Sequence, residues 1–194
     1  MGRPPKTEER SGEIMRAFEA CVLRQGLAAT TLTDVADESG LPRSLVRYFM
    51  GNRDEMVDRL IERLMALATS RIDAVRDSSG DMSVARLLDA YFGEVFADER
   101  SNALMGELWY LARTDPHIRD RIHGVYLYAT SLLTDALTRE RIGSAASRRD
   151  AAFAVLSLAL GQTSLNDFGL AASAGAMRRQ AQRIVESLSM ETSR

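Results

Sequence analysis

The segment 31–53 constrains the fold more than any other part of the chain, because it encodes two short helices on either side of a glycine turn. Thr31 suits the position that precedes a helix, and Asp34 is spaced to complete a capping box with it. Gly40 can adopt the left-handed backbone conformation that ends such a helix. The pattern therefore predicts a helix over 32–39 that ends in a tight turn.

A second short helix is predicted over 42–50, because proline is acceptable in a first helical turn, where its missing N–H would have no partner. The two helices have helix-turn-helix spacing, in which the second helix enters the major groove of DNA. The charges agree with this interpretation. The sequence between Ser39 and Arg53 contains three arginines and no acidic residue, whereas the acidic residues lie on the preceding helix. We therefore predict a local basic surface on the second helix.

A wider set of residues matches a known family pattern. It comprises Ile14, Ala17, Phe18, Cys21, Val22, Gly26, Thr30, Thr31, Val35, Ala36, Gly40, Leu41, Val46 and the run Gly51-Asn52-Arg53-Asp54-Glu55-Met56. Over about residues 10–60 the chain thereby resembles the N-terminal DNA-binding domain of TetR-family transcriptional regulators. Two positions depart from the pattern, since Arg47 and Met50 stand where the family often has Tyr and Phe. Arg47 implies an altered sequence preference or an added phosphate contact.

The rest of the chain predicts helices alone, so we expect an all-α fold of about nine helices. Asn52 and Glu55 form a second capping box that opens a long helix to about Val75. The resemblance implies a three-helix DNA-binding domain followed by a helical effector-binding and dimerisation domain. We place these domains at 1–53 and 54–194, with the long helix as their connector over 53–75.

Further helices follow from the apolar periodicity. The pattern is strict from Val84 to Phe96 and predicts one uninterrupted helix there. Ser147 and Asp150 are spaced as a third capping box, ahead of a helix that is apolar nearly all round over 151–160. The remaining predicted helices span 102–114, 116–139 and 175–188.

The apolar surface of the last two helices exceeds what one small bundle needs, although an interior helix of a monomer would show the same pattern. We expect this surface to be buried against a second copy, in a homodimer through the last two helices. The family resemblance implies the same pairing. Two recognition helices about 34–36 Å apart would then read a pseudo-palindromic operator in double-stranded DNA.

The predicted DNA contacts come from the N-terminal arm and the helix-turn-helix. Thr31 is placed to bind a phosphate through its hydroxyl and N–H groups, and Arg43 and Arg47 lie one turn apart on one helical face. Arginine on an extended arm can enter a narrow minor groove. Thr33 and Arg53 are implied by the resemblance, and Phe49 is either a contact or part of the core. The full set is Arg3, Thr31, Thr33, Arg43, Ser44, Arg47, Tyr48, Phe49 and Arg53.

The resemblance also implies a small-molecule effector pocket in the second domain. Such pockets are mostly apolar with a few polar groups that orient the ligand. The candidates are Tyr91, Phe92, Phe96, Met105, Trp109, Tyr126, Phe153, Gln162 and Asn166, and the aromatic ones are equally interpretable as plain core. The stretch 107–116 looks like the C-terminal domain of the betaine-regulator branch of the family.

Other functional classes receive little support from the sequence. We expect no enzyme, no cofactor and no metal site, because phosphate-loop, dinucleotide-binding, nucleophile-elbow and paired-ligand motifs are absent. The single cysteine fits a reducing cytoplasm, and the longest apolar stretch is too short to span a bilayer. With a net charge of −2, any nucleic-acid surface must be local.

These observations predict a dimeric, cytoplasmic DNA-binding regulator, most simply a repressor that an effector releases. Two alternatives stay open. One is a small-molecule sequestering protein whose DNA-binding unit is vestigial, and the other is a helical-bundle enzyme.

Overall fold

The computed structural model describes residues 5–79, 82–96, 98–170 and 173–191, and within these ranges it contains helices and no strand. The predicted all-α fold is confirmed. The helices are α1 (Pro5–Gln25), α2 (Leu32–Ser39), α3 (Arg43–Met50), α4 (Arg53–Ser79), α5 (Val84–Ala90), the π-helical segment η1 (Tyr91–Val95), α6 (Glu99–Ala112), α7 (Pro116–Arg139), α8 (Ala145–Asp167) and α9 (Ala174–Glu191).

The chain divides into two compact units. The first unit comprises residues 1–64 and 103–118, and the second comprises 65–102 and 119–194. Helix α4 therefore contributes its first half to one unit and its second half to the other. The division that we place at residue 53 stays a prediction.

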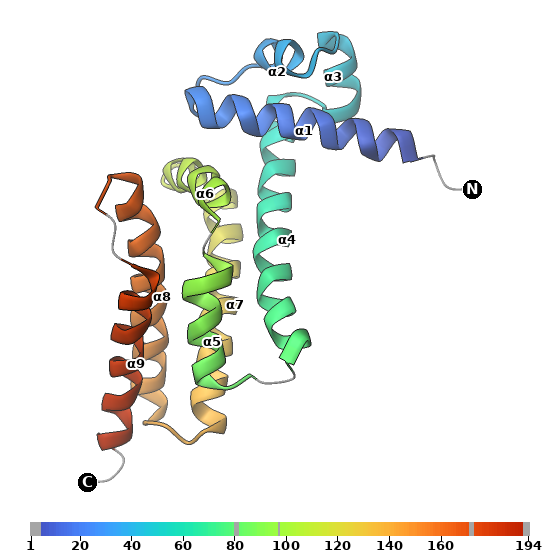
Figure 1. Cartoon of the computed structure of the whole chain (residues 1–194). Helices are drawn as coiled ribbons and strands as arrows, with labels where there is room; N and C mark the ends of the chain where they lie inside the picture. The colour runs from blue at the N-terminus through green and yellow to red at the C-terminus, as the bar shows by residue number, and fades with distance from the viewer. Residues whose placement is uncertain (1–4, 80–81, 97, 171–172, 192–194) are drawn as a thin grey trace. The chain divides into compact units, whose positions relative to one another are not determined.

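In the first unit, α2 and α3 pack on α1, and Figure 1 shows these two short helices lying across it. The shared core includes Phe18 of α1, Val35 of α2 and Val46 of α3, all of which are almost fully buried. The predicted capping boxes at Thr31 and Asn52 are both confirmed by their reciprocal hydrogen bonds. Local sequence and tertiary packing thus specify the same helix-turn-helix.

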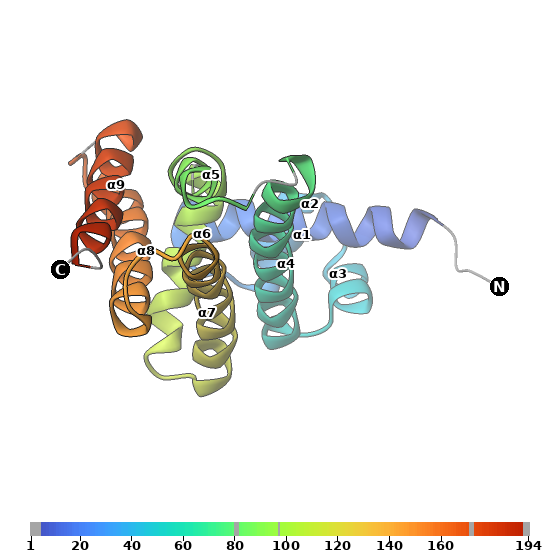
Figure 2. The ribbon, with the colours of Figure 1, turned by 90° about the horizontal axis from the view of Figure 1, so that it is seen from below.

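The second unit is a helical bundle in which α8 and α9 lie side by side (Figures 1 and 2). Its core also draws side chains from the second half of α4 and from α5, η1 and α7. The start of α8 differs from the prediction. Ser144 rather than Ser147 is the N-cap, and Ser147 closes the capping box with it, so the helix begins at Ala145. The side chain of each serine accepts a hydrogen bond from the backbone N–H of the other, so the capping box does not need Asp150.

The helix predicted from Val84 to Phe96 is interrupted. The α-helical part ends at Ala90, and residues Tyr91–Val95 adopt a π-helical turn. Their apolar spacing fits a continuous α-helix, and Tyr91, Phe92 and Val95 are all buried in the π-helical turn. The Tyr91 hydroxyl donates a hydrogen bond to the carbonyl of Ala129 on α7, and burial raises the pKa of this phenol above its usual value. Short π turns are frequent at functional sites.

Gly143, between α7 and α8, is a position where we expect a substitution to destabilise the fold. Its φ is +70°, and a Cβ built there would lie 3.1 Å from Cβ of Leu188 on α9. Gly143→Ala should therefore lower the free energy of unfolding by about 1–3 kcal/mol through backbone strain and overpacking. Chemical denaturation followed by circular dichroism measures this change.

Gly124 provides the matched control, because it lies inside α7 and a Cβ there would meet nothing within 4 Å. Gly124→Ala should raise the free energy of unfolding by up to about 1 kcal/mol. Equal stabilisation by both substitutions would contradict the packing described for Gly143.

No helix in the described part of the chain is long and apolar enough to cross a membrane.

Candidate functional site

Helix α3 has one buried face and one exposed face. Val46 and Met50 are 0% and 1% exposed and anchor the helix in the core of the first unit. Phe49 is half-buried, with its ring edge-on to the Tyr48 ring at a centroid distance of 5.2 Å. The exposed face carries four of the predicted DNA contacts, which are Arg43, Ser44, Arg47 and Tyr48.

The two arginines of this face are unpaired. Among the described residues, neither the Arg43 nor the Arg47 guanidinium has a hydrogen-bond or ion-pair partner. Helix α3 itself contains no acidic residue. Both side chains are therefore free to donate to phosphate oxygens or to the O6 and N7 atoms of guanine.

Thr31 caps α2 as predicted, and its phosphate contact stays a prediction. Its hydroxyl donates to Oδ2 of Asp34 at 2.6 Å, and its backbone N–H donates to the same oxygen at 2.7 Å. The hydrogen bond from the Thr31 hydroxyl, followed by the one from its backbone N–H, lowers the pKa of Asp34 because both bonds stabilise the carboxylate. A negative charge is therefore held at the start of α2. A phosphate would have to compete with that carboxylate, so the geometry assigns Thr31 a capping role. Thr33 is exposed in the first turn of α2.

Arg53, which the resemblance implies as a DNA contact, also makes hydrogen bonds within the protein. Its guanidinium donates to the carbonyl oxygens of Thr30 at 3.1 Å and Leu27 at 2.6 Å, and the residue is half-buried. The arginine therefore fixes the loop between α1 and α2. The local sequence pattern shows a cation at this position, but it does not show that the carbonyls of the loop between α1 and α2 bind it.

Glu107 is a second residue that binds this loop, and the sequence pattern does not predict it. Its carboxylate on α6 accepts the backbone N–H of Leu27 at 2.7 Å, across 80 residues of sequence. Arg53 and Glu107 thus bind the same peptide segment, and both lie within the first unit. An ion pair of Arg24 with Glu38 at 2.7 Å joins the end of α1 to α2. These contacts set the orientation of α2 and, through it, of α3.

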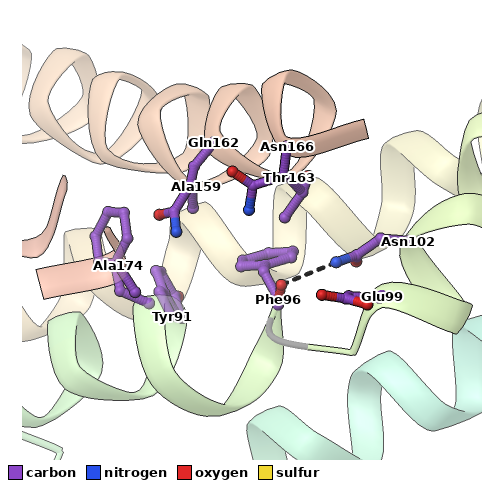
Figure 3. Close-up of a pocket in the computed structure, with 10 residues that line it drawn as sticks. Tyr91, Phe96, Glu99, Asn102, Ala159, Gln162, Thr163, Asn166 and Ala174 are labelled. Carbon is purple, nitrogen blue, oxygen red and sulfur yellow. Dashed lines mark hydrogen bonds between the residues drawn. The ribbon is translucent and has the colours of Figure 1, made fainter. Parts of the chain in front are cut away.

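The second unit contains a cavity of about 340 Å³, shown in Figure 3. Five predicted pocket residues line it: Tyr91, Phe92, Phe96, Gln162 and Asn166. Five further lining residues were missed: Glu99, Asn102, Ala159, Thr163 and Ala174. Tyr91 and Phe92 belong to η1 and Phe96 directly follows it, whereas Gln162 and Asn166 belong to α8. A helical wheel cannot reveal this set, because it is assembled from four elements.

The other four predicted pocket residues do not line this cavity. Met105 and Trp109 belong to the first unit and do not line this cavity. Tyr126 packs against the core of the second unit. Phe153 is 69% exposed on α8 and points away from the core. Aromatic periodicity identified amphipathic faces correctly but did not separate core, surface and cavity.

Arg3 lies outside the described residues. The described part of the chain contains no cluster of metal-ligating side chains.

The known proteins to which this chain is similar include transcriptional regulators. No protein-family model matches the chain. The HTH-type transcriptional regulator TtgR of Pseudomonas putida is 30% identical over 105 residues, which cover 51% of this chain and 49% of that protein. The HTH-type nicotine-responsive transcriptional repressor HdnoR of Paenarthrobacter nicotinovorans is 24% identical over 122 residues, covering 62% and 63%. The chain thus spans about half to two thirds of the length of these relatives.

Solved structures match over nearly the whole chain. A TetR-family transcriptional regulator from Rhodococcus sp. aligns with a TM-score of 0.73 and 17% identity, covering 93% of this chain and 99% of the other. A transcriptional regulator from Saccharomonospora viridis in complex with choline aligns with a TM-score of 0.73 and 16% identity, covering 92% and 96%.

Proposed function

We propose that this chain, which has the fold and the N-terminal sequence pattern of TetR-family regulators, is a dimeric DNA-binding transcriptional regulator. Specifically, it is a repressor that a small-molecule effector releases from a pseudo-palindromic operator. The observation that carries this proposal is the exposed face of α3, which presents two unpaired arginines, a serine and a tyrosine on one side of a short, well-anchored helix.

In this proposal Arg43 and Arg47 contact guanine edges or phosphates, and Ser44 and Tyr48 bind beside them. Thr33 is a neighbouring phosphate contact from α2. Arg53 and Thr31 act as positioning residues, because Nε and Nη2 of Arg53 and the hydroxyl and backbone N–H of Thr31 donate to groups within the protein.

Four large exposed apolar side chains support a homodimer through the last two helices. They lie on α8 and immediately after it: Phe153, Leu165, Phe168 and Leu170. A two-fold contact would bury two copies of each side chain and set two α3 helices for consecutive major grooves.

The cavity of the second unit is the proposed effector site. Helix α4 belongs to both units, so a ligand that favours one arrangement of the second unit can bias the first. A coupling free energy of about 1–3 kcal/mol would change operator affinity by roughly 5–150-fold. The names of relatives support a small-molecule effector, since one is nicotine-responsive and one solved structure contains choline.

A binding titration of the purified protein against DNA from its own upstream region, at 50 and 200 mM salt, tests the function. If Arg43 and Arg47 of both protomers contact phosphates, four cations give an expected loss of affinity of about 150-fold across this range. Unrelated DNA of equal length should bind far more weakly at both salt concentrations.

Because the operator need not lie upstream of this gene, a selection from random duplexes completes the test. Failure to enrich any sequence would contradict the regulator and favour the sequestering protein. Turnover of a cavity ligand would favour the enzyme.

A further inference from the structure

We propose that the cavity of the second unit binds an uncharged planar ring that carries an amide-type group, meaning an N–H donor beside a carbonyl acceptor, as in a carboxamide or a lactam. This inference rests on the proposed function only in calling the ligand an effector. The ligand class itself follows from the amide side chains, the aromatic wall and the charge of the lining residues.

Two amide side chains on α8 are the first observation. Gln162 and Asn166 lie one turn apart on the same face of the helix, and both line the cavity. In Figure 3 both side chains point from α8 toward the side of the cavity where Phe96 and Tyr91 lie. Within the described part of the chain, neither amide makes a hydrogen bond. Each of them therefore offers both an N–H donor and a carbonyl acceptor to a ligand.

The pairing of amide groups decides which polar group of a ligand fits. A carboxamide can donate to the side-chain carbonyl of Gln162 and accept from its N–H, so both halves of the side-chain amide are satisfied at once. A carboxylate accepts from the N–H, but its second oxygen opposes the carbonyl oxygen. An amidinium donates to the carbonyl, but its second nitrogen opposes the N–H donors. Of these three groups, the amide is the one that matches both atoms.

Two further polar residues add acceptors to the cavity. Asn102 donates through Nδ2 to the carbonyl of Phe96 at 2.9 Å, which leaves its Oδ1 as an acceptor. The Thr163 hydroxyl donates its proton to the carbonyl of Leu160 at 2.8 Å and keeps its lone pairs. The lining residues thus mix acceptors with the donors of α8. Such a mixture suits an uncharged ligand that has both kinds of group.

The charge of the cavity disfavours an ionic ligand. Of the ten described lining residues none is Lys, Arg or His, so an anion would find no cation there. Glu99 alone carries a formal charge among them, and it is exposed to solvent. An exposed carboxylate contributes little to holding a cation, because water and salt screen it. The desolvation of a charged ligand would therefore be poorly compensated.

The aromatic wall favours a planar ring. Tyr91 and Phe96 meet edge to face, with ring centroids 6.0 Å apart and planes at 74°. Phe92 lies next to Tyr91 in the same π-helical turn. A ligand ring can pack on these side chains in the offset or edge-to-face geometry that aromatic pairs prefer. The volume of about 340 Å³ lies within the range for small-molecule sites.

Isothermal titration of the full-length protein with three probes of equal size tests the proposal. Benzamide is the uncharged amide, benzoate is the anion and benzamidinium is the cation, and all three carry the same ring and the same number of non-hydrogen atoms. Benzamide should bind with a Kd of about 1 mM or tighter, and each ion should bind at least about tenfold more weakly.

A change of one side-chain group identifies the amide contact. Gln162→Glu replaces the amide by a carboxylate of almost the same shape, which can only accept. It should weaken benzamide binding by about fivefold or more and strengthen benzamidinium binding, so that the order of these two probes is reversed. Loss of packing alone would weaken both probes.

Gln180→Glu on α9 is the matched control. Gln180 is exposed and does not line the cavity, and its substitution changes the net charge by the same amount. The affinity of this variant for all three probes should equal that of the wild type.

Absence of benzamide binding, equal or tighter binding of either ion, or an unchanged order of the probes in Gln162→Glu would each overturn the inference. Operator binding is measured separately on the same samples. Loss of the DNA result alone would contradict the regulator and leave the amide site in place, whereas loss of the benzamide result alone would do the reverse.

Discussion

Replacing Arg43 and Arg47 together by alanine is expected to lower operator affinity by about 100-fold or more. Both side chains are exposed one turn apart on α3, and neither has a partner among the described residues. A bidentate contact to guanine contributes about 1–3 kcal/mol, and a dimer would lose each contact twice. If the arginines bind phosphates instead, the slope of log affinity against log salt should fall by about 3 to 4 units. Fluorescence anisotropy at several salt concentrations distinguishes these two cases.

The control for this variant removes the same charge outside the helix-turn-helix. Arg113 and Arg119 are also exposed, and Arg113→Ala/Arg119→Ala changes the net charge equally. This pair should reduce operator affinity by less than about threefold through long-range electrostatics. Both variants should fold as the wild type does, because the buried face of α3, with Val46 and Met50, is untouched. Circular dichroism checks this expectation. Equal losses in the two double variants would contradict a specific role for α3.

Phe153→Glu is expected to dissociate the proposed dimer and, with it, operator binding. Phe153 is 69% exposed on α8, so the substitution removes little packing from the unit itself. Across a two-fold axis it would remove two buried aromatic side chains, each contributing about 1.5–3 kcal/mol, and oppose two carboxylates. The dimer dissociation constant should therefore rise by about 100-fold or more. Sedimentation velocity should show the wild type at twice the chain mass of 21.4 kDa and the variant at that mass.

Tyr110→Glu is the matched control, since Tyr110 is also 69% exposed but lies on α6. This variant should sediment as the wild type does. A dimer that survives Phe153→Glu would contradict the proposed α8 contact. A dimer lost only in Tyr110→Glu would move the contact to α6.

The helix-turn-helix was predictable because its signals are local. Thr31 and Asp34 cap α2 through atoms three residues apart, and Gly40 ends it with a φ of +67°. The amphipathic pattern of α3 placed Val46 inward and Arg47 outward before any tertiary contact was known. Such features depend on neighbours within one or two turns, so the sequence carries them directly.

The features that the sequence did not predict depend on distant partners. In the π turn the Tyr91 hydroxyl reaches the carbonyl of Ala129 on another helix, whereas the apolar spacing alone fits an α-helix. The sequence shows Arg53 only as a cation, whereas the structure shows that it donates to the carbonyls of the α1–α2 loop. Trp109 is an aromatic residue of the kind that lines ligand pockets, but it lies in the first unit and not in the unit that contains the cavity.

By itself, the sequence determined that this protein is all-helical, where α2 and α3 begin and end, and which face of α3 carries the arginines. Those properties arise from capping and periodicity, which act over a few residues. Only the tertiary structure decided which side chains enclose the cavity and which polar groups, such as Glu107, fix the loop ahead of α2. These groups meet across tens of residues, and nothing in a local pattern specifies which buried donor each carboxylate will reach.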